Sequence, residues 1–303
     1  MIMNNINNKV SIIIPSYNSQ ESIMSCLESL REPMELFEYE IIVVDCSGHN
    51  QVERICSQFS FVNFIKRKKR FNPGEGRNIG AQNADGKLLM FIDADVILEK
   101  NVISNAWNHY KKGYNVFGGS LELSNLSPKT IASRLEHSFY NHESQKNRPA
   151  RKRNNLSSAF LFIEKSLFDE LGGFKDIPRM QDTEFTERIR KTGIDLWFFP
   201  DIVAHQIQDS PLSKVFRKIY INGLNLPSIR YQNRSIWKTI FLFCFLPLIT
   251  LAKCTRIILR NIKYGTYKIK ELAISPLILI GGIVWMFGFY HSIILNREVS
   301  KHR

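Results

Sequence analysis

Acidic residues are almost absent from the last 90 positions of this 303-residue chain. Residues 214–303 hold 15 Lys and Arg side chains but two acidic ones, Glu271 and Glu298. Residues 1–213 balance 26 basic against 26 acidic side chains, so the whole net charge of +13 lies in the C-terminal region. Because that basic region also contains long apolar runs, it favours an anionic membrane surface as partner and argues against nucleic acid.

Cysteine is scarce and its spacing carries no motif. The five cysteines form neither a C-x-x-C pair nor a zinc-ligand spacing, which gives no support to a disulfide framework or a zinc module. They are Cys26, Cys46, Cys56, Cys244 and Cys254. The first ten residues, MIMNNINNKV, also lack the apolar core of a signal peptide. We expect free thiols, and a domain on the cytoplasmic side of the cell membrane that its C-terminal region holds there.

Two apolar segments lie in the basic region, at about 236–252 and 272–295. The second has 24 residues without Asp, Glu, Lys or Arg, and about 20 residues suffice to cross a bilayer. The first has an apolar core of 13 residues containing Pro247, which is closer to an interfacial or re-entrant segment. Basic residues flank both segments, so two topologies stay open: the second segment alone crosses, or the two form a hairpin. We expect a catalytic domain at 1–213 and membrane-associated helices within 214–303.

Residues 1–213 alternate short apolar runs with helical patterns. We predict strands at 10–15, 40–45, 62–65 and 88–92, with helices at 20–30, 52–59 and 73–84. This alternation indicates a Rossmann-like, mostly parallel α/β sheet covered by helices on both faces. Such sheets bind ligands beyond the carboxyl ends of their strands, where Tyr17, Asp45 and Asp93 lie. Later strands are expected at 116–123, 157–163 and 196–199, with a mobile basic loop at 146–155 and solvated basic residues at 66–70.

The sequence FIDADV, residues 91–96, places two carboxylates one residue apart after an apolar strand. Residues i and i+2 of an extended chain point to the same side. Asp93 and Asp95 therefore form a candidate site for Mg²⁺ or Mn²⁺ together with a diphosphate. A solvated turn explains an isolated D-x-D equally well, and the pair alone leaves both interpretations open.

Four ordered motifs resemble the inverting family 2 glycosyltransferases with the GT-A fold, of the membrane-associated bacterial type. They are SIIIPSYN (11–18), IIVVDCSG (41–48), GEGRNIGAQNADGKLLMFIDADV (74–96) and GGFKDIPRMQDTEFTERIRKTG (172–193). The resemblance, over residues 9–210, implies a metal-dependent hexosyltransferase that moves a sugar from a nucleoside-diphosphate sugar, most readily a UDP-sugar. The implied acceptor is a membrane lipid or lipid-linked saccharide in surface glycan synthesis. The tail has no Q-x-x-R-W sequence, which favours transfer of single sugars over processive synthesis.

The resemblance also implies roles on the donor side. Asp93 would serve both the donor and the metal, together with Asp95, and His205 matches a further metal ligand of some relatives. Glycines around Arg77 allow close backbone approach at a helix start, which favours anions. The implied donor-binding residues are Pro15, Ser16, Tyr17, Asp45, Arg77, Asn78 and Asp93.

On the acceptor side the resemblance implies that Asp182 is the base that removes the proton of the acceptor hydroxyl. Gly173, Phe174 and Gln181 would shape that side. A helix N-cap is the plain alternative for Asp182. Two positions depart from the family pattern, Cys46 and Gln181, where acidic residues are usual. They leave room for a catalytically degenerate, transferase-like membrane assembly protein. A nucleotidyltransferase on a similar sheet is a further alternative.

Overall fold

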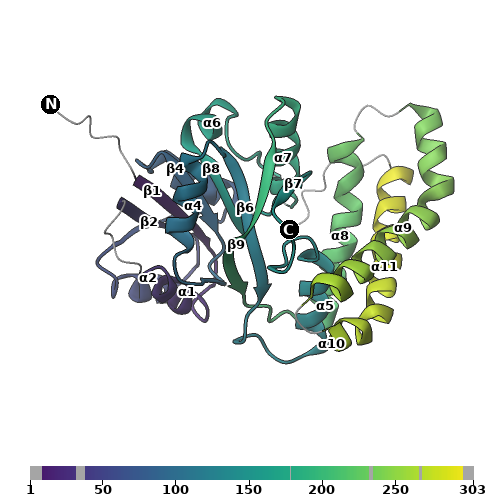
Figure 1. Cartoon of the computed structure of the whole chain (residues 1–303), viewed down its shortest axis with the longest axis horizontal. Coiled ribbons are helices and arrows are strands. Elements are labelled where there is room, and N and C mark those ends of the chain that lie inside the picture. Colours follow the sequence, from purple (N-terminus) through teal and green to yellow (C-terminus); the bar gives the residue numbers. More distant parts are fainter. Residues whose placement is uncertain (1–8, 32–37, 178, 232–234, 266–267, 296–303) are drawn as a thin grey trace. The chain divides into compact units, whose positions relative to one another are not determined.

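The computed structural model describes residues 9–31, 38–177, 179–231, 235–265 and 268–295 (Figure 1). Its contacts divide the chain into two compact units. The first comprises residues 1–121, 149–176 and 181–207, and the second comprises 122–148, 177–180 and 208–303.

The first unit is built on one mixed sheet. Its strands are β1 (Lys9–Ser16), β2 (Glu38–Asp45), β3 (Val62–Lys66), β4 (Leu88–Ile92), β5 (Val96–Leu98), β6 (Val116–Leu123), β7 (Arg151–Arg153), β8 (Phe160–Glu164) and β9 (Leu196–Gln206). Its helices are α1 (Ile23–Ser29), α2 (Gln51–Cys56), α3 (Pro73–Gln82), α4 (Val102–Lys111), α6 (Lys165–Glu170) and α7 (Gln181–Lys191).

The strand order is β3-β2-β1-β4-β8-β6-β9-β5, and β7 pairs with β9 (Figure 1). The pairs β1–β2, β1–β4 and β2–β3 are parallel. The later strands extend this layer with the antiparallel pairs β4–β8, β6–β8, β5–β9 and β7–β9. The carboxyl ends of β1, β2 and β4 therefore meet at one edge of the sheet, where their following residues converge.

Both faces of the parallel layer are buried, as the continuous apolar runs predict. Alternate residues of one strand enter different cores: Ile12 and Ile14 pack in the first, and Ile13 packs in the second. All five residues of β4 are buried. Strands covered on both faces need apolar side chains at nearly every position, so the absence of polar alternation correctly predicted a sheet buried on both faces.

Two expectations about the later part of the chain are wrong. The basic segment at 146–155 contains β7, which pairs with Leu196–Phe198 of β9, so it is not simply a mobile loop. The strand expected at 196–199 continues to Gln206, because β5 and β7 both pair with it. His205 therefore lies inside a strand rather than after one.

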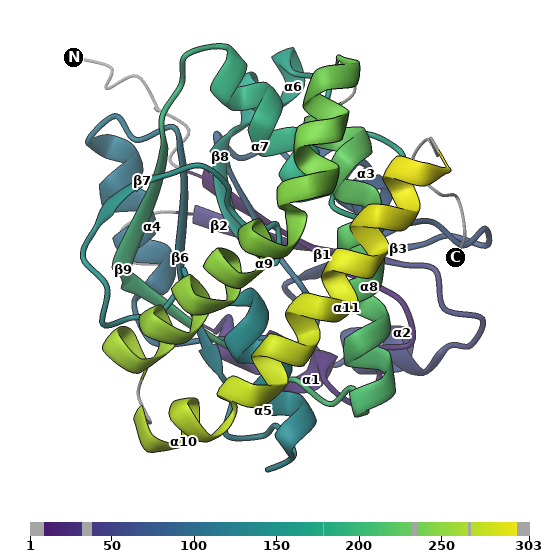
Figure 2. The same ribbon diagram turned by 90° about the vertical axis from the view of Figure 1, so that its right-hand side faces the viewer.

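The second unit is helical. It contains α5 (Ile131–Tyr140), α8 (Leu212–Arg230), α9 (Ile236–Tyr264), α10 (Lys268–Ala273) and α11 (Ser275–Ile294) (Figure 2). Glycines let α8 and α11 touch through their backbones: a Cβ on Gly223 would lie 2.0 Å from the carbonyl oxygen of Trp285, and one on Gly288 would lie 2.2 Å from that of Tyr220. By length and composition, α9 and α11 are the two helices of the described chain that are long and apolar enough to cross a membrane.

Candidate active site

The carboxylate of Asp45, at the end of β2, is fully buried and fully occupied by protein donors. Its Oδ1 accepts hydrogen bonds from the Ser16 hydroxyl at 2.9 Å and the Ser47 hydroxyl at 2.6 Å. Its Oδ2 accepts from the Ser47 amide at 3.2 Å and pairs with Lys66 Nζ at 2.8 Å. These four contacts use the roughly four lone-pair directions of a carboxylate. Asp45 therefore holds together the residues at the carboxyl ends of β1, β2 and β3.

An exposed aromatic ring stands beside this buried cluster. Tyr17, just past β1, is 44% exposed, and the Arg70 guanidinium lies 4.2 Å from the centre of its ring. The adjacent Asn18 has a left-handed backbone, with φ 54°, and its amide donates to the Ser47 hydroxyl at 2.8 Å. A planar ring with a cation over it, next to a rigid strand end, is a surface on which a nucleotide base can stack.

The glycines of the third motif lie inside a helix. Asn72 caps α3, its side chain accepting from the Glu75 amide at 3.0 Å, and Pro73 is the first residue of the helix. A Cβ on Gly80 would lie 2.3 Å from Ile13, and one on Gly76 would lie 2.6 Å from Phe71. Gly76 and Gly80 thus let α3 pack closely on β1 and its surroundings, within the helix predicted at 73–84.

Arg77 of α3 interacts with two of the candidate site carboxylates, those of Asp93 and Asp182. The residue is buried, and one of its guanidinium nitrogens forms an ion pair with the carboxylate of Asp93. The same guanidinium favours the ionised form of Asp182 electrostatically. The segment before β8 also contacts both residues, the Asp182 carboxylate and the Asp93 backbone. The backbone of Ser158 hydrogen-bonds Asp182, and the carbonyl of Ala159 accepts from the Asp93 amide at 3.3 Å.

Asp93 and Asp95 lie in the turn between β4 and β5, not on an extended chain. Both are partly exposed. Asp95 accepts a hydrogen bond from Gln206 Nε2 at 3.2 Å. His205 instead places its Nε2 2.8 Å from Glu99 Oε1. The register of β9 explains the difference, because Gln206 lies opposite Val96 and His205 opposite Ile97.

The carboxylate oxygens of this turn are suitable ligands for a small divalent cation. Within the described residues, no three His, Cys, Asp or Glu side chains gather into a metal site. Mg²⁺ nonetheless needs no full protein cage, since it is commonly held by one or two carboxylates together with substrate phosphates. Two partly exposed carboxylates in one turn match that requirement, and the role of His205 as a further ligand stays a prediction.

Asp182 is the second residue of α7, so it lies inside the helix rather than at its N-cap. Burial raises the pKa of its carboxyl above the ordinary value. The Thr183 amide, which donates to Asp182 Oδ1 at 2.7 Å, and the Arg77 guanidinium oppose this rise. A carboxylate whose pKa is raised is a stronger base while it stays ionised near neutral pH.

The turn that leads to α7 is clamped from two helices. The Asn78 side chain donates to the Phe174 carbonyl at 2.7 Å and accepts from the Phe174 amide at 2.8 Å. Arg188 pairs with Glu184 at 2.9 Å and also donates to the carbonyls of Leu171 and Gly173. Gly173 has φ +65°, and a Cβ there would lie 2.6 Å from Asn78 Oδ1.

Asn78 and Gln181 both have protein partners in this region. Asn78 secures the turn with its amide, so its expected contact with the donor stays a prediction. Gln181 is buried, and its Nε2 lies 3.5 Å from Asn72 Oδ1, the oxygen that caps α3. Gln181, the first residue of α7, therefore contacts the residue that caps the start of α3.

Sequence reasoning missed several residues at this edge of the sheet. Lys66 and Arg70 belong to a basic run expected to be solvated, yet Lys66 pairs with Asp45 and Arg70 covers Tyr17. Gln206 and the Ser158–Ala159 backbone carried no motif. The signal that was available is position: Lys66 directly follows the strand predicted at 62–65, and a polar residue at that point lies at the same edge as Asp45.

A sheet of this order, with carboxylates gathered past the ends of its parallel strands, has the architecture of a GT-A enzyme. The chain belongs to glycosyltransferase family 2, because the family model Glycosyl transferase family 2 matches residues 11–172, more than half of the chain. This confirms the family predicted from the four motifs.

Two curated relatives show how far the similarity reaches. Glycosyltransferase AglE of Haloferax volcanii is 27% identical over 206 residues, which cover 64% of this chain and 66% of AglE. The poly(ribitol-phosphate) beta-N-acetylglucosaminyltransferase TarS of Staphylococcus aureus is 30% identical over 103 residues, which cover 32% of this chain and 18% of TarS. The chain thus spans just under two thirds of AglE and less than a fifth of TarS.

Solved structures share the fold. A mannosyltransferase from Pyrobaculum calidifontis in complex with GDP-Man and Mn²⁺ superposes with a TM-score of 0.59 at 14% identity, over 95% of this chain and 88% of that one. S. aureus TarS 1-349 in complex with UDP-GlcNAc gives 0.51 at 15% identity, over 95% and 92%. At such low identity these likenesses show the fold alone, and they confirm the predicted GT-A architecture.

Proposed function

We propose that this protein is an inverting, metal-dependent glycosyltransferase that moves a single hexose from a nucleoside-diphosphate sugar to an acceptor at a membrane. The observation that carries the proposal is that buried Arg77 pairs with Asp93 and also favours the ionised form of Asp182. It links a candidate diphosphate and metal turn electrostatically to a candidate base. The solved relatives in complex with UDP-GlcNAc or with GDP-Man and Mn²⁺ support a nucleotide-sugar donor.

On the donor side, the base of the nucleotide would stack on Tyr17, with Pro15, Ser16 and Asp45 forming the rigid strand ends behind it. A UDP-sugar is the donor we favour. Asp93 and Asp95 would hold Mg²⁺ or Mn²⁺, and that cation would neutralise the charge that develops on the leaving diphosphate. Arg77 keeps the Asp93 carboxylate oriented and adds a positive charge beside the same group.

On the acceptor side, Asp182 would remove the proton of the acceptor hydroxyl as that oxygen attacks the anomeric carbon. Direct attack from the face opposite the leaving diphosphate inverts the configuration at that carbon. The clamped turn at Gly173 and Phe174 would hold the acceptor side rigid, because Asn78 and Arg188 fix its backbone. Gln181, beside the start of α3, would contact the acceptor.

The acceptor we favour is a membrane lipid or a lipid-linked saccharide of surface glycan synthesis, with the catalytic unit on the cytoplasmic side of the cell membrane. The two long apolar helices and the basic C-terminal region support attachment to an anionic membrane surface.

A screen of nucleotide sugars tests the proposal. The full-length protein in detergent is incubated with UDP- and GDP-linked hexoses, with Mn²⁺, with Mg²⁺ and with chelator, and donor turnover is measured. We expect metal-dependent hydrolysis or transfer with at least one donor, and NMR of the first product should show the anomeric configuration opposite to that of the donor. Retention of configuration would contradict the role of Asp182, and absence of turnover with every donor would favour a degenerate protein.

A further inference from the structure

The packing of the C-terminal helices determines how deeply they can enter a membrane. Of the 22 large hydrophobic side chains that are exposed among the described residues, ten lie on α9 and five on α11. Such a concentration of exposed apolar surface marks a membrane or protein contact. The composition of the two helices is compatible with crossing a bilayer, so their neighbours must decide between crossing and lying within one leaflet.

An ionisable side chain of α9 lies beside the middle of α11. Trp285 is close to the centre of this 20-residue helix, and Lys253 Nζ of α9 lies 3.7 Å from the centre of the Trp285 ring. If α11 crossed a bilayer, Lys253 would lie near the centre of the hydrocarbon. That is the depth at which a charged side chain is least favourable.

An ion pair between α5 and α8 also lies near the level of the middle of α11. Gly281 of α11 is packed against Ile219 of α8 and Phe139 of α5, because a Cβ on Gly281 would lie 3.2–3.3 Å from those side chains. Ile219 is adjacent to Lys218, which forms an ion pair with the buried Glu136 of α5. This level is roughly 5 Å along the helix from its middle, at 1.5 Å per residue. Crossing by α11 would therefore place this pair in hydrocarbon as well.

The uncharged part of α9 is shorter than the hydrocarbon core that a crossing hairpin would have to span. The two helices run antiparallel, with Cys254 beside Gly282 and Tyr290 donating to the carbonyl of Phe243. The uncharged part of α9 is residues 239–252, which span roughly 21 Å. A hydrocarbon core is about 30 Å thick. Beyond residue 252 the face of α9 becomes basic.

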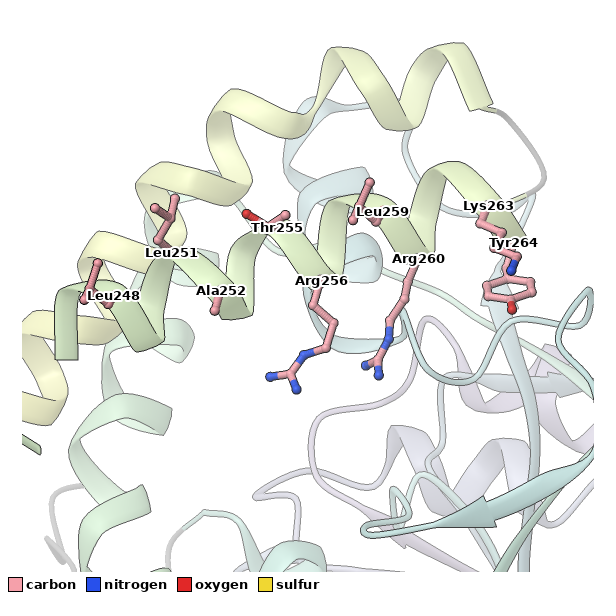
Figure 3. Close-up of a pocket in the computed structure, with 9 residues that line it drawn as sticks. All are labelled: Leu248, Leu251, Ala252, Thr255, Arg256, Leu259, Arg260, Lys263 and Tyr264. Carbon is pink, nitrogen blue, oxygen red and sulfur yellow. The ribbon is translucent and has the colours of Figure 1, made fainter. Parts of the chain in front are cut away.

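One outer face of α9 carries both kinds of side chain in sequence. It is lined by Leu248, Leu251, Ala252, Thr255, Arg256, Leu259, Arg260, Lys263 and Tyr264. We call it the α9 outer face. Figure 3 shows Arg256 and Arg260 leaving the same side of the helix, with their guanidinium groups directed away from it. Arg260 pairs with Glu143, whereas Arg256 and Lys263 have no acidic partner among the described residues.

We propose that α9 and α11 insert into a single leaflet of an anionic membrane and do not cross it. Residues 239–252 of α9 and the exposed side of α11 lie in hydrocarbon, and Arg256 and Lys263 lie among lipid phosphates. Their charge complements the phosphates, and the apolar residues that precede them complement the acyl chains. This inference rests on the membrane attachment proposed above and is independent of the sugar chemistry.

Cysteine accessibility in the full-length protein tests the topology. Cys244 is exposed and the other four cysteines are buried, so Cys244→Ser gives a quiet background. Single cysteines are then placed in the catalytic unit (Glu53→Cys), before α9 (Ser235→Cys), at the end of α9 (Lys263→Cys) and after α11 (Leu295→Cys). Sealed membrane vesicles of each orientation are treated with an impermeant maleimide.

We expect all four cysteines to react from the same side of the membrane. A hairpin would place Lys263→Cys alone on the opposite side, and crossing by α11 alone would place Leu295→Cys there. Either result overturns the proposal. A protein that remains soluble when membranes are pelleted overturns both this inference and the membrane attachment, whereas turnover of a soluble donor and acceptor would still be measured separately.

Vesicle flotation tests the headgroup contacts. Binding of the full-length protein is compared on phosphatidylcholine vesicles with and without phosphatidylglycerol. Each basic residue near an anionic surface contributes about 1 kcal/mol, so Arg256→Gln should weaken binding to the anionic vesicles roughly fivefold. Lys111→Gln, an exposed residue of α4, is the matched control and should have no effect. Equal binding of wild type and Arg256→Gln would overturn the assignment of Arg256 to lipid phosphates.

Discussion

Asp45 is the last residue of β2 and Asp93 directly follows β4, the two strands that flank β1, so they occupy comparable places at one edge of the sheet. Their surroundings differ. Asp45 is fully buried and accepts from Ser16, Ser47 and Lys66. The Asp93 side chain is 34% exposed and pairs with Arg77. The same residue type at equivalent strand ends therefore has its bonding capacity filled by the protein in one case and left partly open to solvent in the other.

The difference suits Asp45 to holding the strand ends in place and Asp93 to contacting a ligand. A carboxylate that already accepts four hydrogen bonds can contact a nucleotide only by exchanging one of them. A partly exposed carboxylate in a turn can take up a cation and a diphosphate without such an exchange. Asp182 resembles neither, because burial raises its pKa while the Thr183 amide and Arg77 keep the ionised form accessible. Three carboxylates thus have three environments, and variants at each should have distinct effects.

The largest effect is expected for Asp182→Asn. Loss of a positioned base lowers turnover by roughly 10²–10⁴-fold, while the KM for the donor should change little because the role proposed for Asp182 is on the acceptor side. Initial rates with the donor found by screening give both values. Glu187→Gln, on the same helix, is the control and should retain near wild-type turnover. Near-normal transfer by Asp182→Asn would show that another group accepts the proton.

A smaller loss is expected for Asp95→Asn. A cation at a diphosphate supplies several kcal/mol of charge stabilisation, so weakening its site should reduce turnover on the order of 10²-fold and raise the Mn²⁺ concentration needed for half-maximal rate. A metal titration of wild type, Asp95→Asn and the exposed control Asp169→Asn measures both. Full activity of the wild type in excess chelator would remove the metal from the mechanism.

The sequence predicted the parallel half of this site far better than the antiparallel half. Strands β1, β2 and β4 follow from buried apolar runs, and each run fixes where its terminal residue lies. The antiparallel pairing of β9 with β5 depends on register, and a shift of one residue would exchange the sides of His205 and Gln206. No local pattern near residue 205 specifies that register. The contacts of Ser158 with the Asp182 carboxylate and of Ala159 with the Asp93 backbone amide are likewise products of tertiary packing.

A change in pH dependence is expected for Arg77→Gln. Burial raises the pKa of Asp182, so activity should fall as the pH drops through a value above that of an ordinary carboxyl group. Arg77 limits this rise, and its removal should move the acidic limb of kcat/KM to still higher pH. Arg77→Lys retains the positive charge and should show a smaller displacement. Rate profiles over the acidic range measure it, and identical limbs in wild type and Arg77→Gln would show that the two groups are not coupled.

The smallest catalytic effect, with the clearest effect on folding, is expected for Asp45→Asn. The substitution leaves Lys66 without its carboxylate partner and replaces one carboxylate oxygen of residue 45 by an amide nitrogen, which cannot accept a hydrogen bond. The free energy of unfolding should therefore fall by about 1–3 kcal/mol. Lys66 is partly exposed, at 29% of its side chain, which lets water compensate and keeps the loss within that range. Adding Lys66→Met should recover part of the loss, because the unpaired charge is then absent. Turnover per folded molecule should stay within a few fold of wild type. Asp45→Asn could instead lose activity as severely as Asp95→Asn while unfolding at the same denaturant concentration as wild type. The Asp45 carboxylate would then have to exchange one of its protein hydrogen bonds for a contact with the nucleotide during the reaction. Asp45 and Asp93 would then both contact the substrate, and they would differ only in when they become available to it.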